Sequence, residues 1–199
     1  MSFKCGIVGL PNVGKSTLFN ALTNSSKAQA ANFPFCTIDP NIGEVIVPDE
    51  RLQQLSKISL SNEIIPTKMN FIDIAGLVKG ASKGEGLGNK LLANIRECDA
   101  LAHVTRCFED ENVTHVNNII DPVADIDIIN TELLLADLES VTKQIENFKK
   151  RSGKKNDEML SLAFLEKVLG LLESGSPVRQ GTFSEEESKM LYLSQFLTS

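Results

Sequence analysis

A glycine-rich segment near the amino end constrains the fold of this chain more than any other feature. Residues 9–17 read GLPNVGKST and match the spacing G-x-x-x-x-G-K-[ST], between the apolar run 3–8 and the amphipathic run 18–22. A strand, a glycine-rich loop and a helix start in this order form a phosphate-binding loop (P-loop), whose main-chain N–H groups converge on one anion. Average residue usage gives this spelling by chance in roughly one chain of this length in a hundred. The segment therefore predicts a site for the phosphates of a nucleotide.

The residues of the P-loop have separate roles in this prediction. The Lys15 ammonium group would neutralise the β- and γ-phosphate oxygens, and the Ser16 hydroxyl would bind Mg²⁺. Gly9 and Gly14 would let the backbone turn around the anion. The predicted nucleotide-binding residues are Asn12, Val13, Gly14, Lys15, Ser16 and Thr17.

A threonine follows in a segment that has no helical or strand periodicity. Residues 24–41 are polar and contain two prolines, and Thr37 lies within them. A threonine on such a loop has no special role by itself. After a P-loop, however, it can close on Mg²⁺ and the γ-phosphate and order the loop only while the triphosphate is intact. We therefore predict Thr37 as a metal ligand and a catalytic residue.

A third nucleotide-sensing segment is expected at the end of an apolar strand over 67–74. Asp73 lies where this strand stops, and Gly76 follows in the spacing D-x-x-G. This spacing lets the aspartate hold the Mg²⁺ shell while the glycine N–H meets the γ-phosphate. The motif alone is weak, but it is strong after the two segments described above. The predicted metal ligands are thus Ser16, Thr37 and Asp73.

Composition limits the classes of protein that this chain can belong to. At 199 residues with 42% hydrophobic content, the chain can bury one core and carry a smaller second unit. No apolar run is long enough to span a bilayer, and residues 1–4 lead into a strand rather than a signal peptide. The net charge of −6 argues against a surface that is basic overall, although a local basic patch remains open. We expect a cytoplasmic protein with no membrane and no DNA partner.

Further strands and helices alternate along the first two thirds of the chain, which indicates an α/β fold. Strands are expected over 43–47 and 100–104, and helical spacing over 89–98. The four cysteines are scattered without a C-x-x-C pair, which favours reduced thiols over a metal site. These cysteines are Cys5, Cys36, Cys98 and Cys107.

From Thr131 onward, two heptad series predict an antiparallel helical hairpin, joined by the polar segment 151–157. The series are Leu134, Leu138, Val141, Ile145 and Phe148, then Leu162, Leu165, Leu169 and Leu172. The hairpin tip is basic, which fits either a solvated cap or a prong that faces RNA or a protein partner. Its basic residues are Lys149, Lys150, Arg151, Lys154 and Lys155. A last helix is expected from the Ser184 cap to Leu197.

Three long motifs resemble those of the YchF (Obg-like ATPase) family, and the resemblance covers essentially the whole chain. They are GLPNVGKST from Gly9, NFPFCT from Asn32 and DIAGLVKGASKGEGLGN from Asp73. The resemblance implies a P-loop NTPase three-layer fold with a mainly parallel sheet and an inserted helical hairpin, or coiled coil. It also implies Mg²⁺-dependent hydrolysis of ATP in preference to GTP, and association with the ribosome and its RNA.

The resemblance also implies roles for residues that the motifs alone leave open. Leu77 stands where many relatives carry the glutamine that orients the attacking water, and a leucine cannot hydrogen-bond water. His115, which by itself would most often be a solvated loop side chain, matches a histidine proposed to do that work in this family. Asn12 matches an asparagine that supports a K⁺ ion in some relatives, and simple turn chemistry explains it equally well.

The chain departs from the family pattern at its end. Relatives read the base with an Asn-x-x-[Glu/Asp] motif on a strand after the hairpin and continue into a TGS-type domain, whereas this chain stops at Ser199. We expect a nucleotide-binding domain over 1–130, a hairpin over 131–175 and a returning segment over 176–199, with the base-reading strand and last domain missing. Two alternatives stay open: an Obg-related GTPase, and a nucleotide-gated ribosome- or RNA-binding module with negligible catalysis.

Overall fold

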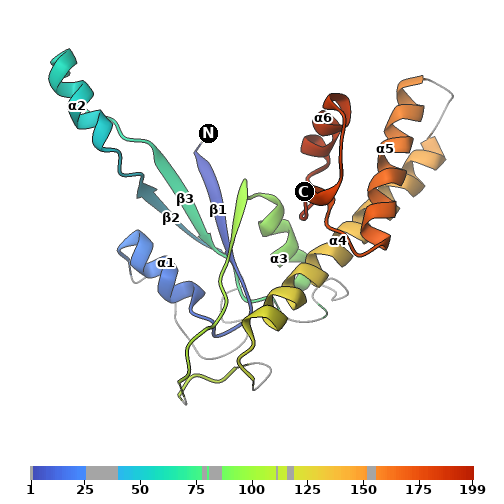
Figure 1. Cartoon of the computed structure of the whole chain (residues 1–199), viewed down its shortest axis with the longest axis horizontal. Helices are drawn as coiled ribbons and strands as arrows, with labels where there is room; N and C mark the ends of the chain where they lie inside the picture. Colours follow the sequence, from blue (N-terminus) through green and yellow to red (C-terminus); the bar gives the residue numbers. More distant parts are fainter. Residues whose placement is uncertain are drawn as a thin grey trace. The chain divides into compact units, whose positions relative to one another are not determined.

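The computed structural model places most of the chain in two compact units, and each is described by itself. The first unit comprises Met1–Leu77 and Glu97–Asp125, and the second comprises Val78–Arg96 and Ile126–Ser199. Figure 1 shows the elements of both units in the colours of the sequence. The residues that the structure describes are 2–25, 40–77, 80, 87–110, 112–115, 119–151 and 156–199.

The first unit is built on a sheet of four strands in the order β2-β3-β1-β4 (Figure 1). Strand β1 pairs in parallel with both β3 and β4, and β2 pairs antiparallel with β3. The carboxyl ends of the three parallel strands therefore meet at one edge of the sheet, where α/β proteins bind ligands. The strands are β1 (Phe3–Val8), β2 (Asn41–Ile46), β3 (Lys68–Asp73) and β4 (Ala100–His103).

The expected strands and the mainly parallel sheet are confirmed, with shifts at the strand ends. Strand β2 starts at Asn41, two residues before the predicted start at Gly43, because Asn41 pairs with Asp73 of the neighbouring strand. This pairing is not visible in the local pattern, where Pro40 and Asn41 are typical loop residues. It brings the Asn41 side chain to the end of β3.

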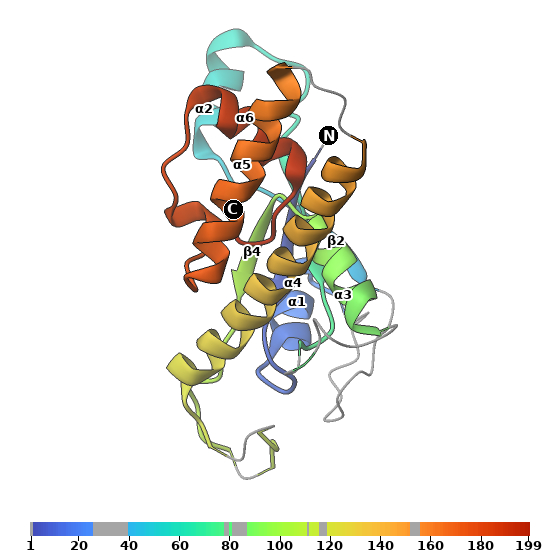
Figure 2. The ribbon, with the colours of Figure 1, turned by 90° about the vertical axis from the view of Figure 1, so that its right-hand side faces the viewer.

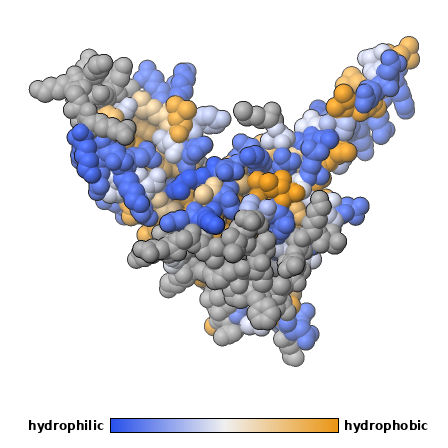
Figure 3. Space-filling view, turned by 180° about the vertical axis from the view of Figure 1, so that it is seen from behind, coloured by the Kyte–Doolittle hydropathy of each residue, from blue (hydrophilic) through white to orange (hydrophobic). Residues whose placement is uncertain are grey.

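Two helices belong to the first unit. Helix α1 (Lys15–Thr23) packs on the sheet through Phe19, which forms a core cluster with Ile7, Phe71 and Val104. Helix α2 (Glu50–Ser59) begins at Asp49, whose side chain accepts a hydrogen bond from the Arg51 N–H. None of its residues is buried, and Figure 3 shows hydrophobic residues on the surface of this segment.

The second unit is helical, and its longest helix starts earlier than predicted. Helix α4 spans Pro122–Arg151, so it begins before the change of character at Thr131. Asp121 explains the difference, because its carboxylate accepts hydrogen bonds from the Val123 and Ala124 N–H groups, each at 3.1 Å. An aspartate cap followed by proline is a strong helix start. Helix α4 thus begins in the first unit and continues in the second.

Helices α4 and α5 (Asn156–Glu173) share the core of the second unit, and Figure 2 shows them beside α6 (Glu185–Ser194). Most of the predicted heptad residues lie in this core, but it also takes Val178 and Phe196 from the segments after α5. The packing is therefore not confined to two helices.

The other elements are α3 (Leu87–Arg96) and the 3₁₀ turn η2 (Val178–Gln180). No helix in the described ranges is both long and apolar enough to cross a membrane.

The end of the chain is tied to α4 by a buried aspartate. Asp137 is completely buried and accepts hydrogen bonds from the Leu197 N–H, the Thr198 N–H and the Thr198 hydroxyl, each at 2.8 Å. Burial raises the pKa of Asp137, and these three donors oppose that shift. Helix α6 ends at Ser194 rather than at the predicted Leu197, because Gln195 adopts a left-handed conformation and the chain turns toward Asp137.

Candidate functional site

The P-loop lies between β1 and α1, at the edge of the sheet where the parallel strands end. Gly9 is required there, because a Cβ atom would lie 2.3 Å from the Val104 carbonyl oxygen of the adjacent segment. Gly14 (φ 101°) caps helix α1 without a side-chain hydrogen bond. Helix N–H groups that lack a side-chain cap can bind an anion. The geometry matches the nucleotide-phosphate site that the sequence predicts.

Lys15 is held inside the loop by a main-chain oxygen. Its side chain is buried, and Nζ donates a hydrogen bond of 2.7 Å to the Leu10 carbonyl. Burial lowers the pKa of Lys15 to about 8, and the nearby Asp73 carboxylate opposes the shift. A buried ammonium group at the mouth of a P-loop is poised to gain a second, anionic partner.

Ser16 and Asp73 meet beside Lys15. The Ser16 hydroxyl donates a hydrogen bond of 2.8 Å to Asp73 Oδ2, while the buried Oδ1 accepts none from the described residues. Burial raises the pKa of Asp73, and the Ser16 hydrogen bond, Lys15 and the Asn41 amide oppose this. A hydroxyl beside a carboxylate with a spare buried oxygen fits the oxygen ligands that Mg²⁺ prefers. Thr37, the third predicted ligand, lies outside the described residues.

The D-x-x-G segment lies directly against the P-loop. The Leu77 N–H donates to the Gly9 carbonyl at 3.1 Å, and a Cβ atom on Gly76 would lie 2.7 Å from the Pro11 nitrogen. Leu77 itself is completely buried. The leucine therefore serves as a core residue here.

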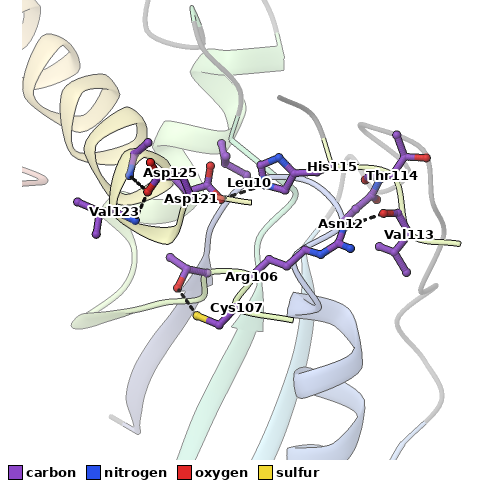
Figure 4. Close-up of polar contacts among 12 residues, drawn as sticks. Leu10, Asn12, Arg106, Cys107, Val113, Thr114, His115, Asp121, Val123 and Asp125 are labelled. Carbon is purple, nitrogen blue, oxygen red and sulfur yellow. Dashed lines mark hydrogen bonds and ion pairs between the residues drawn. The ribbon is translucent and has the colours of Figure 1, made fainter. Parts of the chain in front are cut away.

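His115 is not the solvated side chain that a loop position suggests. It is buried, and its Nε2 lies 2.9 Å from Asp125 Oδ2 in the first turn of α4. The neighbouring Thr114 carbonyl accepts a hydrogen bond of 3.1 Å from the P-loop residue Asn12 (Figure 4). The expectation that an isolated loop histidine is solvated is therefore wrong for His115, because its partner comes from the first turn of a helix that sequence reasoning started only at Thr131.

Arg106 shapes the segment that carries His115. Its guanidinium group is buried and donates to the carbonyls of Phe108, Asp110 and Val113, at 3.0, 3.0 and 2.7 Å. It also lies 4.8 Å from the centre of the Phe108 ring. Sequence reasoning missed Arg106, because a single arginine in an acidic segment resembles any solvated charge.

The structure brings together most of the predicted site residues. Lys15, Ser16, Asp73 and Gly76 converge at the P-loop, and Asn12 connects it to the segment of His115. Val13 is buried in the loop, whereas the Thr17 side chain is exposed on α1. No three His, Cys, Asp or Glu side chains of the described chain gather as a metal site, and its Cys5, Cys98 and Cys107 form no disulfide with one another.

His103, the other histidine of the chain, is expected to have a pKa below its usual range. Burial lowers its pKa, with Asp125 opposing and Lys15 adding to the shift, and its buried Nε2 has no hydrogen-bond partner within the described residues. A folded-state pKa below 6.5 means that the unfolded chain takes up the proton first as the pH falls. Stability should therefore decrease as the pH falls below about 6.5.

Proton NMR should give a His103 titration midpoint below 6.5, assigned by its loss in His103→Gln. Thermal denaturation at pH 7 and pH 5.5 should show a larger decrease for the wild type than for this variant. A midpoint at or above 6.5 would contradict the burial argument.

Comparisons with known proteins agree with this geometry. A family model described as 50S ribosome-binding GTPase matches residues 4–163. The protein named ribosome-binding ATPase YchF is 55% identical in Haemophilus influenzae over 199 residues, and 52% identical in Bacillus subtilis over 200 residues. The match covers 100% of this chain and 54% of each of these relatives, so the chain spans about half of their length.

A solved structure is similar over the same extent. The chain matches the structure of the Schizosaccharomyces pombe YchF GTPase with a TM-score of 0.77 and 40% identity, over 99% of this chain and 54% of that one. The likeness includes the mixed, mainly parallel sheet and the helices described above. The chain therefore belongs to the YchF family, within the family described as 50S ribosome-binding GTPase.

Proposed function

We propose that this chain is the nucleotide-binding part of a cytoplasmic, ribosome-associated nucleoside triphosphatase that hydrolyses ATP, in preference to GTP, with Mg²⁺. The observation that carries the proposal is the hydrogen bond from Ser16 to the buried Asp73, beside the buried Lys15 at the P-loop. The preference for ATP is supported by the bacterial relatives, which are named ribosome-binding ATPases. The Schizosaccharomyces pombe protein is named a GTPase, so the choice of base needs a direct test.

In this proposal the P-loop would bind the phosphates, and Ser16 and Asp73 would hold the metal. Main-chain N–H groups of residues 12–17 and the Lys15 ammonium group bind the β- and γ-phosphates. The metal would be Mg²⁺, which would neutralise charge on the phosphate oxygens, and Thr37 is proposed as its third protein ligand. Asn12 is also a candidate for supporting K⁺, and turn chemistry, which its left-handed backbone (φ 63°) fits, explains this residue equally well.

Because no glutamine follows Gly76, catalysis would depend on one residue that senses the γ-phosphate and another that positions the attacking water. The Gly76 N–H would meet the γ-phosphate, and His115 would help to place the attacking water. Leu77 is buried and apolar, so it cannot replace the missing amide. A slow rate that depends on a partner is expected from this arrangement.

The preference between ATP and GTP is tested on the full-length protein. Equilibrium titration with ATP and GTP, each with and without Mg²⁺, should give tighter binding of ATP and a further gain on adding the metal. Asp73→Asn should lose the gain in affinity that Mg²⁺ gives. The control is Asp99→Asn, which changes an exposed carboxylate that accepts a hydrogen bond from the Lys4 N–H, and it should keep this gain. No measurable binding of either nucleotide would refute the proposal, and tighter binding of GTP would transfer it to the Obg-related alternative.

A second candidate function, a docking role of the basic hairpin tip, rests on the helix pair α4–α5. Lys150 is exposed at the end of α4, while Lys149 lies 3.8 Å from Glu166 of α5. Lys154 and Lys155 lie outside the described residues. Reversing the charge of Lys150, Arg151, Lys154 and Lys155 should weaken sedimentation with ribosomes and flatten its salt dependence. Reversal of the exposed Lys143 and Lys189 provides the control, and equal binding by both sets would favour a solvated cap.

A further inference from the structure

The histidine proposed to place the water is held in a position where it cannot contact bulk water. The His115 side chain is only 3% exposed, and its partner Asp125 is 2% exposed. Figure 4 shows the imidazole directed toward the first turn of α4, with Leu10 of the P-loop nearby. A group that places an attacking water must reach that water within hydrogen-bond distance. In the observed position, the Nε2 atom of His115 is instead engaged by Asp125.

Asp125 is well suited to hold the imidazole. A carboxylate accepts hydrogen bonds, so Nε2 of His115 carries the hydrogen in the 2.9 Å contact. Asp125 lies in the first turn of α4, where the helix dipole stabilises negative charge. A charge-assisted hydrogen bond in a buried site is about twice as strong as a neutral one. The Asp125 Oδ1 atom is buried without a hydrogen-bond partner among the described residues, so the carboxylate has no competing protein donor there.

The segment of His115 is held at two other places. Arg106 binds three carbonyls of residues 108–113, which fixes the segment at its start. Asn12 of the P-loop binds the Thr114 carbonyl, immediately before His115. Asn12 is also a predicted nucleotide contact, so this bond connects the histidine segment to the phosphate site. Of these contacts, the one to Asp125 is made by the imidazole itself, so it must break if the ring is to move.

We propose that Asp125 is a positioning residue that latches His115 in a buried, inactive position, so that release of this contact is a step in turnover. This inference rests on the proposed function, because it takes the role of His115 from there. In the latched position Nε2 donates to Asp125, and the imidazole is kept from the water near the γ-phosphate. Release exchanges this hydrogen bond for one to water. The latch explains in structural terms why the unaided rate should be slow.

The latch is first tested without nucleotide turnover. Diethylpyrocarbonate should modify His115 slowly in the wild-type protein, at least about tenfold more slowly than an exposed histidine, with the site identified by mass spectrometry. Asp125→Asn should increase this rate several-fold, because the neutral amide holds the imidazole less strongly. The control is Asp121→Asn, which changes the cap of the same helix, where Asp121 accepts from the Val123 and Ala124 N–H groups, and keeps a good capping residue. Modification of wild-type His115 at the rate of an exposed histidine would overturn the proposal without any variant.

The second measurement is single-turnover hydrolysis. Asp125→Asn should raise the basal rate about threefold to tenfold with little change in nucleotide affinity, and Asp121→Asn should leave both unchanged. A lower rate in Asp125→Asn, with its thermal stability preserved, would overturn the latch and assign Asp125 an activating role. His115→Ala separates the two proposals: if it retains full turnover, the catalytic role of His115 fails, while the modification result still decides whether Asp125 holds the imidazole.

Discussion

Replacing Lys15 with methionine should strongly weaken nucleotide binding without lowering the stability of the fold. The Lys15 pKa falls from 10.5 to about 8 because the side chain is buried. At about 1.4 kcal/mol per pKa unit, the protonated ammonium group costs the fold on the order of 3 kcal/mol at neutral pH. This cost is present below pH 8 and decreases as the pH rises toward 10.5. Methionine keeps the apolar stem and removes the charge, so the melting temperature should stay the same or rise.

Binding should respond in the opposite direction, because the same charge faces the triphosphate in the proposed complex. Loss of a buried, charge-assisted contact should weaken the binding of Mg²⁺–ATP by at least about a hundredfold. Isothermal titration and thermal denaturation measure the two effects. Lys68→Met is the matched control: Lys68 is half exposed and paired with Glu44 on the sheet, so little change is expected in either measurement. Retained affinity in Lys15→Met would remove this residue from the site.

Gly76→Ala should displace the D-x-x-G segment from the P-loop. The added Cβ would lie 2.7 Å from the nitrogen and 2.9 Å from the Cα of Pro11, so main chain must move on one side. That movement strains the hydrogen bond from the Leu77 N–H to the Gly9 carbonyl and disturbs the buried Leu77. Overpacking of this kind destabilises by roughly 1–3 kcal/mol. Because the Gly76 N–H is the proposed γ-phosphate sensor, hydrolysis should fall at least about tenfold.

Urea denaturation and single-turnover hydrolysis measure these two effects. The matched control is Gly170→Ala on helix α5, where no heavy atom lies within 4 Å of the added Cβ. A glycine inside a helix is less stable than alanine, so this variant should gain roughly 0.5–1 kcal/mol and keep its activity. If Gly76→Ala matched the wild type in both measurements, the close approach to Pro11 would have no functional weight.

The phosphate site was accessible from sequence because its signals are local. The segment 9–17 needs only a strand before it and a helix after it, and both were visible in the apolar periodicity. Asp73 and Gly76 could be added because D-x-x-G follows the end of a predicted strand, and parallel strands end at the same sheet edge. The family resemblance then supplied what spacing could not, the roles of His115 and Leu77.

The ends of helices were harder to predict from the sequence where a residue distant along the chain determines them. Helix α6 stops at Ser194 because the chain turns to bring Leu197 and Thr198 to Asp137, about sixty residues earlier. Helix α4 begins at Pro122, and here the Asp121-Pro122 pair was a local signal that sequence reasoning did not use. With that start in view, Asp125 would have been placed in the first helical turn.

The sequence alone determined the order of strand, P-loop and helix and the residue types at the phosphate site, because these depend on spacing along a short stretch of chain. Only the tertiary structure decided that His115 is buried against Asp125, that Arg106 supports its segment and that Leu77 belongs to a core. Each of these facts depends on which distant groups exclude water from a side chain. Burial and pairing of that kind are properties of the packed chain, and no local pattern of residues carries them.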